Sequence, residues 1–174
     1  MSKTTWTENE ERYRADFDRA LVARDRGERR TAIDILLSVC RNLQSGDRRL
    51  ATHSHLQLSN LLNHESDPEG RLRHAAIAAS ISPRYELASL VLFHALLAVG
   101  RSEDAMREMV RYVSLKDSPM YREVLGVGYS LELPMPELEL AVQARTLLRD
   151  RENDASAEET PEPEKPEPEK PAPG

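Results

Sequence analysis

Residues 86–119 read ELASLVLFHALLAVGRSEDAMREMVRYVSLKDSP, and this stretch decides the fold. Its apolar residues recur at three- and four-residue steps on both sides of Gly100, which is typical of two helices joined by a turn. A matching set lies 34 residues earlier, and each set is followed by a proline: Leu58, Leu62, Ala75 and Ala78 before Pro83, then Leu92, Leu96, Met109 and Tyr112 before Pro119. A period of this length predicts stacked helical hairpins, because one hairpin cannot bury its own apolar face.

The same spacing of apolar residues extends on both sides of this unit. It predicts three hairpins. Their helices are expected over residues 8–26 and 31–43, from 48 to between 64 and 68 and over 70–81, and over 85–99 and 103–117. A fourth unit is expected to be short or bent after Tyr121, because Gly126 and Gly128 each cost about 1 kcal/mol relative to alanine inside a helix. A last amphipathic segment, from Leu138 to Leu148, is the candidate capping helix for the open end of the stack.

Composition indicates one folded domain with two extensions. Of the 174 residues, 39% are hydrophobic and 5% are aromatic, which suits a modest core of aliphatic side chains between helices. The formal charge of −6 is concentrated in residues 151–174, which carry eight acids and three basic residues and alternate Glu-Pro with Lys-Pro. We therefore expect a flexible N-terminus over 1–8, a helical repeat domain over 9–150 and a disordered acidic tail over 151–174.

The hairpins resemble the tetratricopeptide repeat, in which small residues lie where the two helices cross and a proline follows the second helix. The matching residues in the three hairpins are Ala20, Ala23, Gly27, Ala32 and Leu36; Leu58, Ser59, Leu62, Ala75, Ala78 and Pro83; and Leu92, Phe93, Leu96, Gly100, Ala105, Met109 and Pro119. Val39 and Ala78, at equivalent places in the first two units, are 39 residues apart, which predicts a longer turn over 44–49. Over residues 9–150, the resemblance implies an all-α fold, in which antiparallel hairpins form a short right-handed superhelix with a C-terminal capping helix.

The resemblance also implies a concave groove lined by the first helix of each hairpin. Carried over position by position, its lining is Arg14, Phe17, Leu21 and Arg24; His53, Leu56, Asn60, Asn63 and His64; and Leu87, Leu90, His94 and Leu97. In this family such grooves commonly hold an extended peptide or a helix of a partner protein. Apolar Phe17 and Leu21 stand where members that clamp a C-terminal carboxylate carry polar groups, so we expect an apolar or amphipathic ligand segment.

These features favour a non-enzymatic cytoplasmic adaptor that binds another protein in the groove. Two alternatives use the same fold: a self-associating structural subunit, which would be a homo-oligomer, and a cytoplasmic chaperone for a secreted or assembled client. The sequence has no apolar run long enough for a signal peptide or a membrane span. Its single cysteine, Cys40, fits a reducing compartment.

Neither a catalytic site nor a metal site is predicted, and we expect no cofactor. The sequence holds no glycine-rich phosphate loop, no nucleophile elbow and no zinc-protease motif. His53 and His55 point about 200° apart around a helix, and no two histidines have the three- or four-residue spacing of a helical metal site. Cys40 follows apolar Val39, which predicts a small, buried thiol with a raised pKa.

Arginines near the hairpin turns raise the alternative of a basic edge that binds phosphate or an acidic partner. They are Arg29, Arg30, Arg48, Arg49, Arg71 and Arg73. They lack the interleaved aromatic residues typical of proteins that bind single-stranded nucleic acid. We therefore interpret them as solvated residues that pair with nearby acids, and we expect no nucleic-acid partner.

Overall fold

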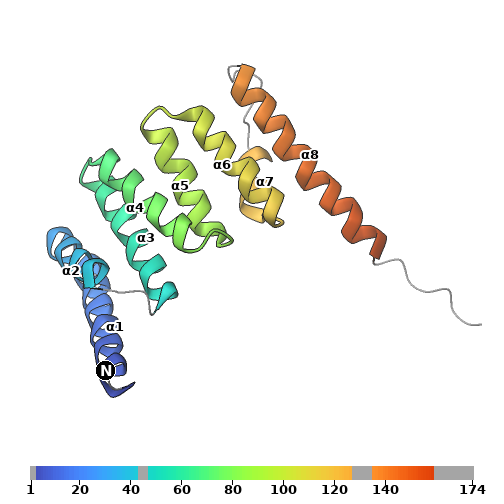
Figure 1. Ribbon diagram of the computed structural model, residues 1–174. Coiled ribbons are helices and arrows are strands. Elements are labelled where there is room, and N and C mark those ends of the chain that lie inside the picture. Colours follow the sequence, from blue (N-terminus) through green and yellow to red (C-terminus); the bar gives the residue numbers. More distant parts are fainter. Residues whose placement is uncertain (1–2, 43–46, 127–134, 159–174) are drawn as a thin grey trace, which may run out of the picture.

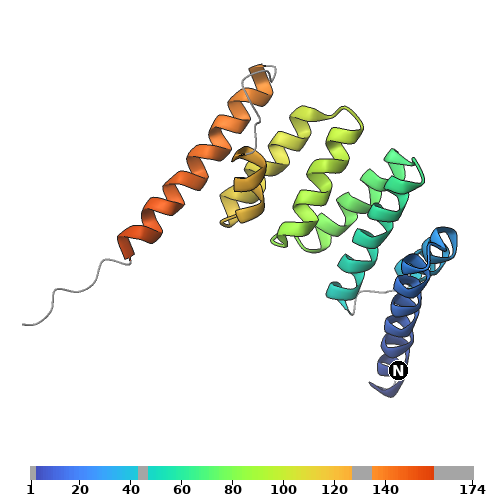
Figure 2. The ribbon, with the colours of Figure 1, turned by 180° about the vertical axis from the view of Figure 1, so that it is seen from behind.

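The structure, a computed structural model, describes residues 3–42, 47–126 and 135–158. This part of the chain is all-α, as predicted, and Figure 1 shows its helices in one row from α1 to α8. Figure 2 shows the same order from behind. The helices are α1 (Lys3–Asp25), α2 (Arg29–Asn42), α3 (Arg48–His64), α4 (Pro68–Ile81), α5 (Glu86–Ala98), α6 (Ser102–Leu115), α7 (Pro119–Gly126) and α8 (Met135–Glu158).

Neighbouring helices pack against one another along the row. From α1 to α6 each helix contacts the next one in the chain, and α8 then packs on α6. The chain thus forms the hairpins α1–α2, α3–α4 and α5–α6, followed by the short α7 and the long α8. This arrangement is compatible with a helical repeat fold.

Side-chain contacts link the first helices of successive units at a nearly constant sequence separation of 32 or 33 residues. The separation is close to the 34-residue period found in the sequence, so one period corresponds to one hairpin with its connections. The contacts are Arg24 Nη1 to Gln57 Oε1 at 2.7 Å, the rings of His53 and Tyr85 at 5.7 Å between centroids, and Ser89 Oγ to Tyr121 Oη at 2.9 Å.

The largest core cluster lies between α5, α6, α7 and α8. Phe93, Met109, Tyr112 and Tyr121 are fully buried in it. Small residues on α8 allow this helix to approach α6 closely, so α8 covers the apolar side of α6. The buried residues that α8 adds are Ala141, Ala144 and Leu148.

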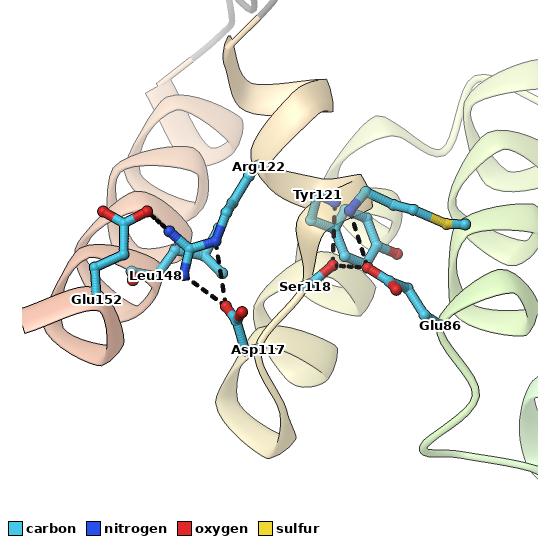
Figure 3. A network of polar contacts seen from close by, with 8 residues as sticks. Glu86, Asp117, Ser118, Tyr121, Arg122, Leu148 and Glu152 are labelled. Carbon is cyan, nitrogen blue, oxygen red and sulfur yellow. Dashed lines mark hydrogen bonds and ion pairs between the residues drawn. The ribbon is translucent and has the colours of Figure 1, made fainter. Parts of the chain in front are cut away.

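The start of α7 is fixed to α5 by a group of hydrogen bonds (Figure 3). Ser118 Oγ accepts a hydrogen bond from the backbone N of Tyr121 at 3.0 Å, as an N-cap does. Glu86 of α5 accepts hydrogen bonds from Ser118 Oγ at 2.5 Å and from the backbone N of Met120 at 3.0 Å. The short helix therefore begins at a position that α5 determines.

On its other side α7 is tied to α8 by Arg122 (Figure 3). The guanidinium donates to the carbonyl of Leu148 at 3.3 Å and forms an ion pair with Glu152. Arg151 of α8 in turn donates to the carbonyl of Ser114 at 2.9 Å. These contacts attach α8 to its neighbours as far as residue 152. The helix itself continues to Glu158, although we expected the disordered tail to begin at residue 151.

Two of the remaining helix ends are closely followed by glycines in the sequence. Gly27 and Gly100 adopt positive φ angles of 79° and 75° in the turns that close α1 and α5, a conformation that favours glycine. The described part of α7 is short and reaches Gly126, one of the two glycines expected to limit this unit. At the N-terminus, α1 already begins at Lys3, whereas we expected a flexible segment over 1–8. Gly128, residues 44–46 of the longer turn predicted over 44–49 and the tail over 159–174 lie outside the described residues, whereas residues 48 and 49 belong to α3.

Candidate functional site

One side of α5 carries mostly apolar side chains, one of which, Leu87, is exposed to solvent. Leu87, Leu90, His94 and Leu97 follow one another at steps of three and four residues, so they share one side of the helix, which we call the α5 face. Leu87 is 36% exposed and His94 is exposed, whereas Leu90 and Leu97 are half-buried against the core. All four residues belong to the groove predicted from the sequence.

The composition of α5 sets it apart from an ordinary surface helix. Its sequence, ELASLVLFHALLA, contains one carboxylate, Glu86, and neither lysine nor arginine. Around the rest of α5, Ala88, Phe93 and Leu96 are buried and Leu92 is half-buried. A helix that is apolar on all sides is normally buried on all sides, and a surface helix normally turns a charged side to water. The α5 face therefore has the chemistry of a contact surface.

Two exposed residues that the sequence analysis missed extend the α5 face at its N-terminal end. Tyr85 is 37% exposed and Met120 of α7 is 38% exposed. The hydrogen bond from Met120 to Glu86 brings the starts of α5 and α7 together, and the ring of His53 on α3 meets Tyr85 edge-on. The repeat period did not point to Met120, because Met120 lies 34 residues after Glu86, which was not a predicted groove residue.

Polar groups from three helices meet at the C-terminal end of the α5 face. Arg71 Nη1 donates a hydrogen bond to Asn63 Oδ1 at 2.7 Å, and Arg71 Nε is buried without a hydrogen-bond partner. His94 is exposed to solvent but partly covered by its neighbours. This partial burial and, next, the charge of Arg71 lower the pKa of His94, which therefore favours the neutral ring. Asn63 and His94 were predicted groove residues, whereas we had interpreted Arg71 as a solvated turn residue.

A separate polar hollow of about 260 Å³ lies between α1, α2 and α3. Three predicted groove residues line it, namely Arg24, Asn60 and His64. Arg24 is held there by Gln57 Oε1 at 2.7 Å and by Asp25 Oδ1 at 2.7 Å. The predicted groove thus has a polar section beside α1 and an apolar section on α5.

The other predicted groove residues are tied into the fold. Arg14 forms an ion pair at 2.9 Å with Asp47, the residue that caps α3. Phe17 and Leu21 are half-buried, and Phe17 packs on the core of the first hairpin. Leu56 is only 2% exposed, because it packs in a cluster of small residues with Ala78, Ala79 and Ala88. We therefore assign Leu56 to the core and leave it out of the surface that a ligand could reach.

The histidines of α3 point to opposite sides, as helix geometry predicts. His53 faces Tyr85, whereas His55 Nδ1 lies 2.9 Å from His74 Nδ1 of α4, with the two rings stacked. Burial and, next, His74 lower the pKa of His55 from 6.5 to about 4. Burial, followed by the charge of Arg73, also lowers the pKa of His74. Spacing along one helix did not reveal this pair, because its members come from two helices.

The single thiol behaves as predicted. Cys40 is half-buried against the core of the first hairpin, and burial raises its pKa from 9.0 to about 12. A thiol in this state is mostly protonated at neutral pH and is a poor nucleophile.

The six turn arginines do not form one basic edge. Helices α2 and α4 begin at the end of the stack where α3 ends, so Arg29 and Arg30 share a small hollow with Glu65. Arg48, at the start of α3, lies at the opposite end and donates to the carbonyl of Ile81. Because successive helices run in opposite directions, the arginines near the hairpin turns are divided between the two ends of the stack.

Comparison with known proteins assigns no family to this architecture. No protein-family model, no curated protein and no solved structure matches the chain. Within residues 3–42, 47–126 and 135–158, no group of three His, Cys, Asp or Glu side chains is placed to hold a metal ion. None of the helices in these ranges has the length and apolar character needed to cross a membrane.

Proposed function

We propose that this protein is a non-enzymatic adaptor that binds an amphipathic segment of another protein on the α5 face. The observation that carries the proposal is the mostly apolar and partly exposed side of a helix that has no lysine or arginine. Covering this side with a partner would remove apolar surface from water, which is the main driving force of most protein association. The proposed location is the cytoplasm.

The two ends of the α5 face define what the partner must offer. At the N-terminal end, Tyr85, Leu87 and Met120 present large apolar groups of the kind that fill pockets between partners. At the C-terminal end, Arg71 and the amide of Asn63 offer polar groups. A short helix or extended segment with apolar side chains and one acidic or carbonyl group beyond them would match both ends.

We further propose that the hairpins belong to the tetratricopeptide type and wind into a right-handed superhelix. Small residues that this type places at helix crossings are fully buried, among them Ala20, Ala32, Ala75 and Ala105. Helix contacts between successive units also recur at nearly the period of that repeat. In this arrangement the first helices α1, α3, α5 and α7 would line the binding side.

An affinity capture with matched variants tests the proposed function. Leu87→Asp combined with His94→Asp places two charges on exposed positions of the α5 face, so the fold should tolerate them. The control, Val142→Asp, changes a residue of α8 that is 52% exposed. We expect the wild type and the control to retain the same partner from cell extract and the double variant to lose it, at unchanged melting temperature.

Two outcomes would contradict the adaptor. Equal recovery of a partner by all three proteins would show that the α5 face is not the binding surface. Recovery of nothing except further copies of this chain would favour the self-associating subunit instead.

A further inference from the structure

A second groove lies on the opposite side of α5 and is bounded by α4 and α6. It has a volume of about 510 Å³, and we call it the arginine groove. Its floor is apolar and consists of Leu72, Ala76, Leu92 and Leu96. Leu92 and Leu96 point about 180° away from the α5 face, so the two surfaces are distinct. The rim carries Arg73, Arg101, Arg107 and Arg111 with the acids Asp104 and Glu108.

The rim keeps free hydrogen-bond donors although most of its arginines are paired. Arg101 pairs with Asp104 at 2.7 Å. Arg111 binds Glu108 through two nitrogens at 2.6 Å each and donates through its third, Nη1, to the carbonyl of Pro83 at 3.2 Å. Arg107 pairs with Glu103 through one nitrogen. A guanidinium has five N–H donors, so each of these residues has donors left over. Arg73 makes no hydrogen bond or ion pair to any residue that the structure describes, and the lining has a net charge of +2.

We propose that the acidic, proline-rich end of this same chain, residues 159–174, docks in the arginine groove. This segment contains five glutamates and two lysines, and it repeats the pentapeptide PEPEK over 161–165 and 166–170. Its prolines match the apolar floor, and its carboxylates match the arginine rim. The proposal concerns another surface than the α5 face and does not rest on the adaptor function.

The segment is long enough to reach the groove. Ser102 Oγ bonds Glu137 Oε1 at 2.5 Å and Arg151 bonds the carbonyl of Ser114, so α6 and α8 run side by side in the same direction. From Glu158 the chain must return past the end of α6 to Arg111, a path of about 20 Å when the width of one helix is included. Sixteen residues in the extended polyproline conformation span about 50 Å.

The length and periodicity of the repeat also suit the groove. From Arg101 to Arg111 the rim follows α6 for about 15 Å, which equals five residues at about 3.1 Å each. In a polyproline helix, residues three apart share one face, so Pro168 and Pro171 can lie together on the floor. Glu167 and Glu169 then point to either side of Pro168, where the arginines of α4 and α6 lie.

Disulfide trapping in the full-length chain tests the docking. In a Cys40→Ala background, one variant combines Ala76→Cys on the groove floor with Pro168→Cys. The control combines Gln143→Cys, an exposed position of α8, with the same Pro168→Cys. We expect the groove pair to form an intramolecular disulfide about tenfold faster than the control pair in dilute solution, because docking raises the local concentration.

Charge reversal separates specific docking from random encounter. Adding Arg73→Glu and Arg107→Glu to the groove pair should reduce trapping to the rate of the control pair, whereas adding Arg149→Glu on exposed α8 should leave it fast. Equal trapping rates for the groove pair and the control pair would overturn the proposal. Disulfide-linked dimers whose yield rises with protein concentration would overturn it as well, because a second copy would then supply the segment.

Discussion

Acidification should destabilise this protein through the pair His55 and His74. In the folded chain the pKa of His55 is lowered from 6.5 to about 4, first by burial and then by His74. As the pH falls, His55 therefore binds a proton near pH 6.5 in the unfolded chain but only near pH 4 in the folded chain. The associated stability is complete above pH 6.5 and is lost progressively as the pH falls towards 4.

The size of the effect follows from the geometry of the pair. The difference between the two pKa values sets an upper limit of about 3 kcal/mol, at about 1.4 kcal/mol per pH unit. The ring of His55 is only half-buried, so screening by water reduces the contribution below this upper limit. We expect the free energy of unfolding to fall by about 1 kcal/mol between pH 7.5 and pH 5 on account of this residue.

Urea unfolding of three proteins at several pH values isolates this contribution. His55→Gln keeps a polar partner for His74 Nδ1 but cannot titrate, so its stability should fall less than that of the wild type by about 1 kcal/mol at pH 5. His64→Gln changes an exposed histidine of the same helix and should follow the wild type. If His55→Gln loses as much stability on acidification as the wild type, the buried pair does not control the pH dependence and the reasoning is refuted.

Two further predictions concern packing and capping. Phe93→Ala should reduce the free energy of unfolding by about 3–5 kcal/mol in a urea titration, because Phe93 is fully buried and meets Tyr121 edge-on. The control Leu115→Ala, at an exposed site, should cost less than about 1 kcal/mol in the same titration. Gly70→Ala should cost about 1 kcal/mol despite the higher helix propensity of alanine, because the added methyl group would lie 2.2 Å from Asp67 Oδ2 and displace the N-cap of α4. In an Asp67→Ala background the same change should no longer cost stability, and a full additional loss in the melting temperature there would contradict the capping argument.

Local patterns were sufficient to predict both helices of the middle hairpin, α3 and α4. The predicted start at residue 48 coincides with that of α3, and the predicted end, between residues 64 and 68, includes the observed end at His64. The N-cap at Asp47 and the turn after His64 both depend on local sequence. The predicted start at Gly70 was two residues late, since Asp67 and Pro68 form the cap and first turn of α4. The end of α8 was predicted too early, because contacts of Arg151 and Glu152 with distant residues extend the helix.

The candidate surface could be predicted only in part. The period placed Leu87, Leu90 and His94 together on one side of α5. It treated Leu56 as the equivalent of Leu90, yet Leu56 is buried because alanines of α4 and α5 allow the helices to close over it. Burial of this kind depends on the distance between helices, which a spacing pattern does not contain.

Contacts between helices were the least predictable feature. The approach of His55 to His74 requires the rotation of α3 relative to α4, and the residues are 19 positions apart. The arginine groove combines Arg73 of α4 with Arg107 of α6, which lie one 34-residue period apart, but the period alone does not show that they border one groove. Repeat spacing relates such equivalent positions, whereas His55 and His74 occupy different positions of one hairpin.

Photo-cross-linking from the α5 face tests the central claim most directly. A photoreactive phenylalanine analogue at position 87, introduced into the full-length chain in its own cells, would lie on the exposed start of the α5 face. The same analogue at position 142, on the outer side of α8, is the matched control. The adaptor account predicts a cross-link to one distinct protein from position 87 and none from position 142. The absence of any cross-link from position 87, or the same products from both positions, would contradict it.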